Sequence, residues 1–516
     1  MVLACGVVAR RFGVAAPVLL LACGAVLGFA PALRQVRLPP EVVLLLFLPA
    51  LLYWETLTIS LREIRSNLRV IVLNSTALVI ATAAAVAAVV HALGLGWGPA
   101  WVLGAAVAPT DATAVGALAG SLPRRTITVL RAESLVNDGT ALVVYGVAVG
   151  ATVSREPFSV PHIGWLFVLG YGGGALAGAL IAWLAIQVRR RLDDPFAENV
   201  AIILIPFTAF LLAQAVHASG VLAVVACGLI MGHVAPRLGH PGTRQQTEAF
   251  WSLSVFLLNG ALFVLVGLEL QAAARSLTSA ELSRGLVLVA AVSAAVVGAR
   301  FAWVFTVPYV IRTLDRRPQQ RLRRVGPRVR VVSAVAGFRG AVSLAVALSV
   351  PETVASGAAF PDRDLIVFVT AGVIVVTLVL EGLALPGVMR WARLPRDASA
   401  ETERHLADTL AAEEALAAIP QLAAELSTDP EIAERVRRET EKYLRVLHAS
   451  EDGADDESAL RYDQQYSALR LAMLAHKRAT VVRLRDERRI DDTVLLQVQR
   501  RLDIEEVRLS RGEGAS

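Results

Sequence analysis

Four polar side chains fall within little more than one helical turn of an otherwise apolar segment, residues 133–138. Ser134 and Asp138 are four residues apart and would share one helix face, and Glu133 and Asn137 would share a neighbouring face. Hard cations such as sodium take several oxygen ligands of this kind. The run therefore predicts a cation site. Structural polar contacts between helices are the alternative, which explains one of these residues but poorly explains the whole cluster.

A second acidic residue, Asp111, stands in the apolar run Ala108-Pro109-Thr110-Asp111. Proline removes a backbone donor and breaks the helical ladder, which leaves carbonyl groups free near the carboxylate. In transporters, interrupted helices meet near the membrane midplane and hold ions with such groups. A proline kink with Thr110 and Asp111 as caps of the next half-helix is the structural alternative, and the two roles are compatible.

Two further charges lie in apolar segments, where each would cost about 2.5–3.5 kcal/mol at the bilayer centre. Arg339 stands between glycines in Gly337-Phe338-Arg339-Gly340, where unwinding would let it neutralise helix ends or a buried carboxylate. Glu133 is the partner to test, and a snorkelling arginine is the alternative. Glu55 either joins the site or anchors the cytoplasmic membrane edge. Glu269 and Glu381 are expected to be structural or interfacial.

The composition places these residues in a membrane protein. The 516 residues are 55% hydrophobic and 18% charged, with a mean hydropathy of +0.58, too apolar for an ordinary soluble domain. A crossing needs roughly 20 apolar helical residues, and a short segment at 2–9 indicates a truncated first helix or a start that lies upstream. Twelve segments are candidates: 14–30, 38–57, 68–93, 97–119, 127–152, 161–186, 198–216, 219–234, 249–274, 285–311, 331–350 and 364–390.

The arginines give the orientation. If residues 2–9 form a first helix, the loops on one side hold 20 arginines and those on the other side hold 6, and the rich side is cytoplasmic. This predicts thirteen helices with the N-terminus outside. The basic residues lie in short loops between spans and do not form a phosphate-binding stripe, so we expect no nucleic-acid partner.

The chain changes character after residue 395. Residues 1–395 carry 31 Lys+Arg and 18 Asp+Glu, whereas residues 396–516 carry 19 and 26. Segments 401–426, 431–449 and 462–508 have the apolar periodicity of amphipathic helices. We therefore predict a membrane domain over 1–395 and a helical cytoplasmic region over 396–516. The cysteines, Cys5, Cys23 and Cys227, lack metal-site or disulfide spacing and are expected to act as small hydrophobic residues.

Six stretches in order along about 390 residues make the chain resemble the bacterial sodium/proton antiporters of the monovalent cation/proton antiporter superfamily, in their NhaP-like, electroneutral branch. The tail is also similar, at Arg489-Ile490-Asp491-Asp492 and 502–506. The six stretches are Leu38-Pro39-Pro40 through Glu55, Ala108–Asp111, Glu133–Gly139, Gly220–Val224, Phe250-Trp251 with Asn259–Leu270, and Gly337–Ser343.

The resemblance implies an all-α fold of 12–13 transmembrane helices with inverted repeats, two crossed discontinuous helices and a homodimer. It implies that Asp138 binds Na+ or a proton, with Asp111, Ser134 and Thr110 completing the ion shell and Glu55 contributing through water or at the entrance. Glu133 and Arg339 would form a structural pair. Asn137 stands where electrogenic relatives carry a second aspartate, so the resemblance implies electroneutral exchange.

The predicted function is thus Na+/H+ antiport in the bacterial inner membrane, among lipid, with no cofactor beyond the transported ions. K+ or Li+ antiport and a cation efflux channel are the alternatives. A channel would need a repeated filter-like segment, and the sequence shows none. An intramembrane hydrolase would need a histidine near Ser134 or a Gly-x-Gly-Asp pattern, so we expect no enzyme. A sensor with the tail as output would need a nucleotide loop or kinase-like motif, which the tail lacks.

Overall fold

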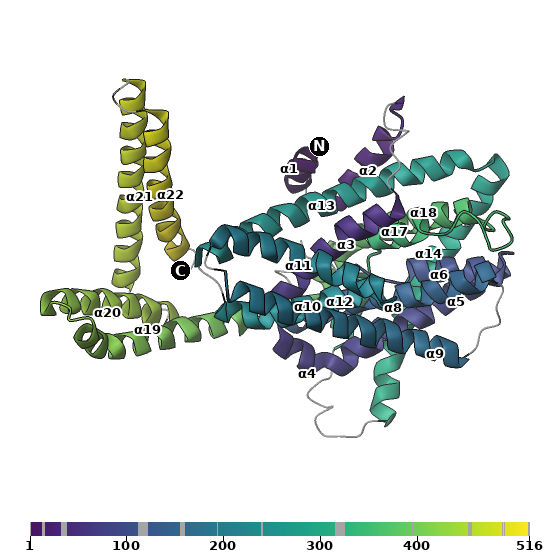
Figure 1. The fold of residues 1–516 in the computed structure, drawn as a ribbon, viewed down its shortest axis with the longest axis horizontal. Coiled ribbons are helices and arrows are strands. Elements are labelled where there is room, and N and C mark those ends of the chain that lie inside the picture. The colour runs from purple at the N-terminus through teal and green to yellow at the C-terminus, as the bar shows by residue number, and fades with distance from the viewer. Residues whose placement is uncertain are drawn as a thin grey trace. The chain divides into compact units, whose positions relative to one another are not determined.

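The computed structural model describes most of the chain (Figure 1). Outside the described residues lie 1, 13–15, 32–38, 112–121, 155–159, 193, 239–240, 315–325, 395–396, 398, 453–456, 488, 490 and 514–516. Parts of three predicted spans, 14–30, 38–57 and 97–119, therefore lie outside. The described residues are helical apart from turns and one isolated β-bridge between Thr353 and Ala359.

Contacts between Cα atoms divide the chain into two units, Met1–Arg396 and Asp397–Ser516. The helices of the first unit are α1 (Val2–Phe12), α2 (Ala16–Leu27), α3 (Pro40–Thr58), α4 (Leu61–Val72), η2 (Leu73–Leu78), α5 (Val79–Ala92), α6 (Trp97–Val107), α8 (Arg124–Ser154), α9 (Val160–Val168), η4 (Leu169–Gly173), α10 (Gly174–Arg189), α11 (Pro195–Ala215), α12 (Gly220–Val234), η5 (Ala235–Arg237), α13 (Pro241–Ser276), α14 (Ser279–Leu314), α16 (Pro327–Val335), α17 (Ala341–Leu348) and α18 (Arg363–Ala392).

The described residues of the second unit form four helices, α19 (Ser399–Glu425), α20 (Pro430–Asp452), α21 (Glu457–Asp486) and α22 (Asp492–Glu513). In Figure 1, α19 lies beside α20 and α21 beside α22, in agreement with the contacts between them. Ala412, Leu444 and Leu447 form a small apolar core. Arg478 of α21 reaches Asp503 of α22 at 2.6 Å. The predicted helical character of the tail is therefore present, and its cytoplasmic location stays a prediction.

Short polar side chains fix where several membrane helices begin. Ser60, Asp194 and Ser219 each accept a backbone N–H of the first turn of α4, α11 and α12, which satisfies donors that have no partner within the helix. In α4 the helix continues into η2, a π-helical segment. Such segments re-aim side chains and are frequent at functional sites.

Seven described helical spans are long and apolar enough to cross a membrane, and four shorter apolar helices accompany them. Large apolar side chains such as Leu176, Trp165 and Leu286 are exposed on their surfaces, as expected where lipid replaces water. The chain is a multi-pass membrane protein. In four of the predicted crossings the described helices are shorter than a full span, namely Ala16–Leu27, Val42–Thr58, Trp97–Val107 and Gly220–Val234.

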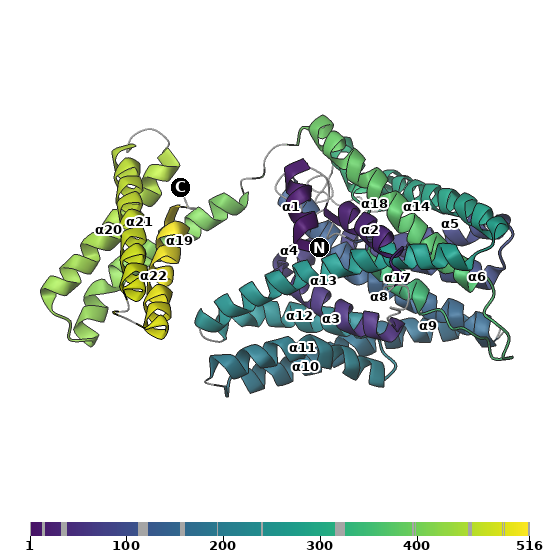
Figure 2. The ribbon, with the colours of Figure 1, turned by 90° about the horizontal axis from the view of Figure 1, so that it is seen from above.

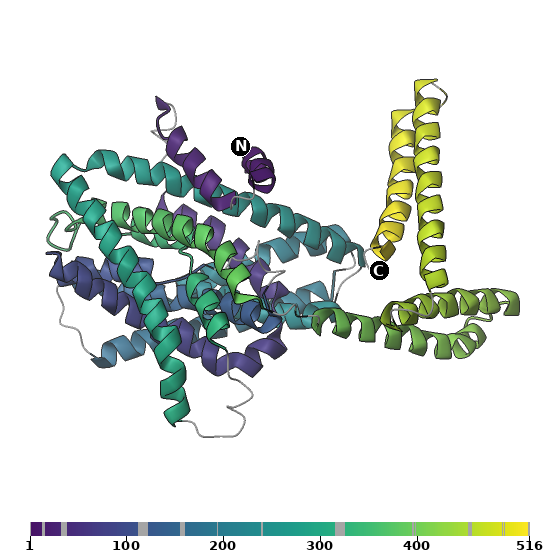
Figure 3. The ribbon, with the colours of Figure 1, turned by 180° about the vertical axis from the view of Figure 1, so that it is seen from behind.

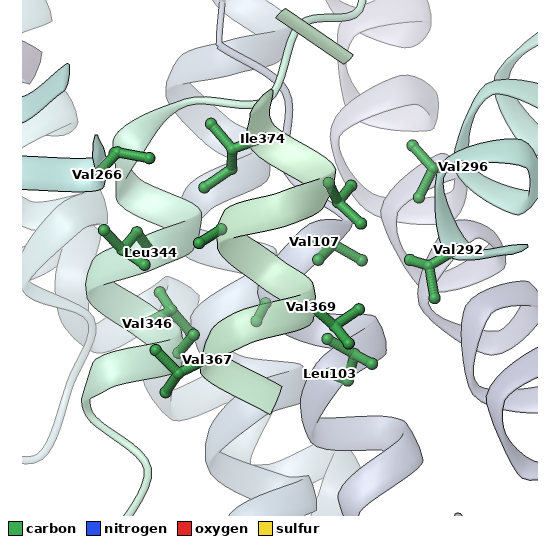
Figure 4. Close-up of a cluster of buried hydrophobic side chains, with 14 of the residues drawn as sticks. Leu103, Val107, Val266, Val292, Val296, Leu344, Val346, Val367, Val369 and Ile374 are labelled. Atoms are coloured by element: carbon green, nitrogen blue, oxygen red, sulfur yellow. The ribbon is translucent and has the colours of Figure 1, made fainter. Parts of the chain in front are cut away.

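Two apolar cores hold the first unit together. Helices α3, α10, α11 and α12 enclose one core, and Figure 2 shows the last three packed as neighbours. The other core joins α5, α6, α14, α17 and α18. Figure 4 shows Leu103, Val292, Leu344 and Val369 meeting there from four of these helices, and Figure 3 shows α14 crossing the back of this bundle.

Two interrupted helices cross inside the first unit. Helix α6 ends at Val107 and the chain runs extended to Asp111, while the α16–α17 line is broken over Ala336–Gly340. The two breaks meet, because the Asp111 backbone N–H donates to the Phe338 carbonyl at 2.7 Å. The two breaks of the predicted crossed helices therefore lie together, and residues 112–121, where the first of these helices would resume, lie outside the described residues.

The crossing demands glycine at 340. A Cβ atom added there would lie 2.3 Å from Oδ2 and 2.6 Å from Cβ of Asp111. We predict that Gly340→Ala lowers the melting temperature in detergent, with a cost of about 1–3 kcal/mol for overpacking. Gly298→Ala in α14 is the matched control, because its Cβ would meet nothing within 4 Å. Equal melting temperatures for the two variants would contradict this close approach.

Candidate cation site

A small cavity lies at the helix crossing. It measures about 30 Å³, which exceeds the roughly 10–15 Å³ that one water molecule requires and suits a small dehydrated ion. Asp138, Ser134, Asp111, Thr110 and Glu55 all line it. Of the six residues predicted to bind the ion, five thus share one cavity.

Helix α8 supplies two sets of polar groups that point in different directions. Ser134 and Asp138 are buried and face the cavity. Asn137 is also buried but does not line it, because its amide nitrogen donates to the Thr110 carbonyl at 3.0 Å and to the Thr110 Oγ1 at 2.9 Å. Asn137 therefore ties the extended segment after α6 to α8. The Asn137 side chain, which was predicted to bind the ion, therefore lies outside the lining of the cavity.

The donor set is of the hard-oxygen type. The described residues hold no group of three or more His, Cys, Asp or Glu side chains placed to bind a metal. A cation at Asp138 would therefore draw on hydroxyl and main-chain oxygens as well as carboxylates, the ligands that alkali and alkaline-earth ions accept. Thr110 offers both kinds, a hydroxyl and a carbonyl with a second lone pair beside the Asn137 bond.

Behind the cavity, Glu133 forms a buried ion pair. Its Oε1 lies 2.7 Å from the Arg300 Nη1 of α14, and both side chains are about 3% exposed. Its Oε2 accepts the Asn74 amide of η2 at 3.0 Å, and Thr110 Oγ1 lies 3.4 Å from Oε1. Paired and hydrogen-bonded in this way, the Glu133 carboxylate can remain ionised without water.

The predicted pairing of Glu133 with Arg339 is wrong. Arg339, 1% exposed, donates through Nε to the Val107 carbonyl at 3.2 Å and through Nη1 to the Gly337 carbonyl. These carbonyls lie at the C-terminal ends of α6 and α16, where helices leave acceptors unpaired and carry partial negative charge. Neutralising helix ends, the other role foreseen for this arginine, is the one observed. A snorkelling arginine is excluded by its burial.

The remaining acids divide between the site and its surroundings. Glu55 of α3 is half-buried and lines the cavity, so it does more than anchor the membrane edge. Glu381 of α18 is buried, with an unpartnered Oε2. Glu381 is thus a structural residue and not an interfacial one.

The sequence analysis missed Arg300 and Asn74. Arg300 lies inside the predicted span 285–311, so the cost of a charge in an apolar span was a signal that could have found it. Asn74 lies inside the span 68–93, but the neighbouring residues do not predict the π-helical turn that directs its side chain to Glu133. Asn259 also lines the cavity, from α13.

Comparison with known proteins agrees with this geometry. Residues 1–391 match the family described as "Sodium/hydrogen exchanger, transmembrane". The chain belongs to the sodium/hydrogen exchanger family. The predicted resemblance to bacterial cation/proton antiporters is thereby confirmed, and the family is one of transporters.

The exchanger is similar along its whole length to named relatives. A protein of Mycobacterium tuberculosis named as an uncharacterized Na+/H+ exchanger is 45% identical over 506 residues, covering 98% of this chain and 93% of its own. YjcE of Escherichia coli, which is also named as an uncharacterized Na+/H+ exchanger, is 30% identical over 531 residues, covering 98% of this chain and 96% of its own. The solved structure of the antiporter MjNhaP1 from Methanocaldococcus jannaschii aligns with a TM-score of 0.58 at 19% identity, covering 75% of this chain and 95% of its own, which shows a shared fold.

The pairing in the exchanger can be tested with double-mutant cycles. We predict that Arg300→Met lowers the free energy of unfolding by about 3–5 kcal/mol, because Glu133 stays buried without its partner, and that adding Glu133→Gln recovers part of the loss. The same cycle with Arg339→Met should show weaker coupling to Glu133. Thermal stability in detergent measures both.

The Arg189–Glu198 pair is the matched control for this cycle. It joins α10 to α11 at 2.6 Å, equally buried but away from the cavity. Its disruption should destabilise the protein to a similar extent while leaving the coupling between Glu133 and Arg300 unchanged. A coupling between Glu133 and Arg339 as strong as that with Arg300 would overturn the pairing.

Proposed function

We propose that this chain exchanges Na+ for H+ across the bacterial inner membrane, with Asp138 as the carboxylate that binds the two ions alternately. One observation carries the proposal: Asp138 is buried at the helix crossing and shares a small cavity with Asp111, Ser134 and Thr110. These are the Na+ ligands that the family resemblance implies. Antiport is also in the names of its relatives, including a "Sodium, potassium, lithium and rubidium/H(+) antiporter" of Bacillus subtilis, 30% identical over 72% of this chain.

The mechanism needs only competition for one carboxylate. Desolvation penalises a bare carboxylate in a low-dielectric site. A proton on Asp138 removes the charge, and a sodium ion offsets it. Either loaded form can therefore be carried across, whereas the empty anion crosses only at high cost. Each Na+ that leaves is replaced by one H+, which enforces exchange.

The surroundings of Asp138 favour an electroneutral ratio. Asn137 carries no proton to exchange and is committed to Thr110. The Glu133 carboxylate is neutralised by Arg300. Neither group therefore adds a second exchangeable proton, and one Na+ for one H+ moves no net charge.

The location and assembly belong to the same proposal. The bias of arginines toward one set of loops supports a cytoplasmic C-terminal region and an inner-membrane location, and the resemblance supports a homodimer. Because the family is one of transporters, we assign no enzymatic reaction to the chain. K+ or Li+ as the exchanged cation would keep the same site.

We predict that Asp138→Asn abolishes Na+/H+ exchange without lowering the melting temperature, since the amide can neither bind a proton nor compensate a cation. Purified protein in vesicles containing a pH-sensitive dye, under an imposed pH gradient, measures the exchange on addition of Na+, K+ or Li+. Asp364→Asn at the start of α18, a carboxylate with a 55% exposed side chain, is the control and should leave exchange intact.

A membrane-potential clamp completes this test. Exchange that is insensitive to the clamp supports the electroneutral ratio. Normal exchange by Asp138→Asn would refute the site, and cation flux without counter-movement of protons would replace antiport by a channel. Response to K+ alone would keep the site and change the substrate.

A further inference from the structure

A second and larger cavity opens behind the ion site, on the arginine-rich side of the first unit. It measures about 220 Å³ and is enclosed by α4, η2, α8, α14 and α16. It does not include Asp138, and it shares Asn74, Leu78, Glu133 and Arg300 with the surroundings of the ion site. Its lining therefore calls for an explanation of its own.

The polar part of this lining is strongly cationic. Its charged members are Arg69, Arg125, Arg300, Arg330 and Glu133. Glu133 is paired with Arg300, so the lining carries an excess of positive charge. An anion is the occupant that this charge attracts.

Arg330 points most directly to such an anion. Its side chain is 7% exposed, and its Nε is buried without a hydrogen-bond partner. Its guanidinium carbon lies 5.4 Å from the centre of the Tyr309 ring, a contact that gives Nε no acceptor. A buried guanidinium is costly without an acceptor, and a phosphate oxygen is the acceptor that arginine geometry fits.

The rest of the lining is apolar and continues toward lipid. Val304, Val307 and Ile311 of α14 line the cavity. On the same helix Tyr309 and Val310 are 56% and 48% exposed, at the end of a span long and apolar enough to cross a membrane. A free inorganic anion would leave this apolar wall uncovered, whereas an acyl chain would cover it.

We propose that this cavity binds an anionic phospholipid, with its phosphate against Arg330 and one acyl chain along Val304, Val307 and Ile311. We name this cavity the lipid pocket. It is independent of which cation the chain carries.

The lipid pocket is connected to the ion site by hydrogen bonds. Trp303 of its wall donates to Asn74 at 3.0 Å, and Asn74 donates to Glu133 at 3.0 Å. Glu133 contacts Thr110 at 3.4 Å, and Thr110 lines the ion cavity. Resting on the proposed function, the lipid should therefore affect the rate of exchange as well as stability.

The binding test uses the full-length protein in detergent and follows its melting temperature. Phosphatidylglycerol should raise it, and phosphatidylcholine or inorganic phosphate should not, because ligands stabilise the state they bind. Arg330→Gln should weaken the apparent affinity for phosphatidylglycerol about tenfold or more, by loss of a charge-assisted hydrogen bond. Arg328→Gln is the matched control, an exposed arginine on the same helix outside the lining.

A second pair of variants keeps the charge. Val307→Trp should fill the apolar wall and abolish the effect of phosphatidylglycerol, while Val310→Trp, on the exposed face of the same helix, should not. Equal responses of Arg330→Gln and Arg328→Gln, or of the two tryptophan variants, would overturn the lipid pocket in favour of diffuse surface charge. A shift by inorganic phosphate alone would overturn the lipid and leave a free anion.

Exchange in vesicles separates this proposal from the proposed function. Wild-type exchange should be several-fold faster in vesicles of phosphatidylcholine with phosphatidylglycerol than in phosphatidylcholine alone, and Val307→Trp should remove the difference while keeping the basal rate. Exchange that is present but equal in both vesicles, without any melting shift, rejects the lipid pocket alone. A melting shift without any exchange rejects the antiporter and keeps the lipid pocket.

Discussion

Two broken helices in a water-free layer leave backbone groups that solvent cannot satisfy, and the architecture follows from how they are satisfied instead. The Asp111 backbone N–H donates to the Phe338 carbonyl of the opposite break. The carbonyls of Val107 and Gly337 are left over, and Arg339 donates to both. The two breaks therefore stabilise each other, and neither would be tolerable alone at this depth.

The same constraint decides how the other charges are paired. Because the Arg339 donors serve helix ends, Glu133 needs a different cation, which Arg300 supplies from α14. Asn137 holds Thr110 and adds no charge. Once these groups are accounted for, Asp138 remains as the α8 carboxylate that faces the small cavity. Of the two acidic residues of α8, Asp138 is therefore the one without an ion pair, which is the condition that the proposed exchange of a proton for a cation requires.

The sequence predicted the parts of this site that depend on local rules. Proline at 109 and the glycines around Arg339 mark the breaks, since both residue types oppose a continuous helix. The four-residue spacing of Ser134 and Asp138 placed both on one face, and both line one cavity. What could not be predicted is which arginine meets Glu133, because Arg300 and Arg339 are both within apolar spans and only the three-dimensional crossing separates their roles.

The contact that Asn137 makes with Thr110 could not be predicted for a related reason. Sequence spacing put Asn137 beside Asp138, but adjacent residues of a helix point about 100° apart, and the extended Thr110 segment lies on the Asn137 side. Helical periodicity predicts the direction of each side chain but not which residues of other segments it contacts. The π-helical turn at Leu73–Leu78 is a similar case, since tertiary contacts such as that of Ser75 with Thr140 at 2.6 Å accompany it and residue preferences do not foretell it.

The walls of the ion cavity come from both cores of the first unit. Asp111, Thr110 and Asp138 belong to the crossing and α8, whereas Glu55 of α3 and Asn259 of α13 close the cavity from the other side. If the crossing and α8 shifted against α3 and α13, Asp138 and its hydroxyl partners would move together. The residues opposite them, such as Glu55 and Asn259, would change. Since the paired charges behind Asp138 move with it, such a shift would not separate Glu133 from Arg300. For the proposed mechanism, a cavity at this boundary would allow alternating exposure of Asp138 to the two sides of the membrane without moving a bare charge through the membrane interior.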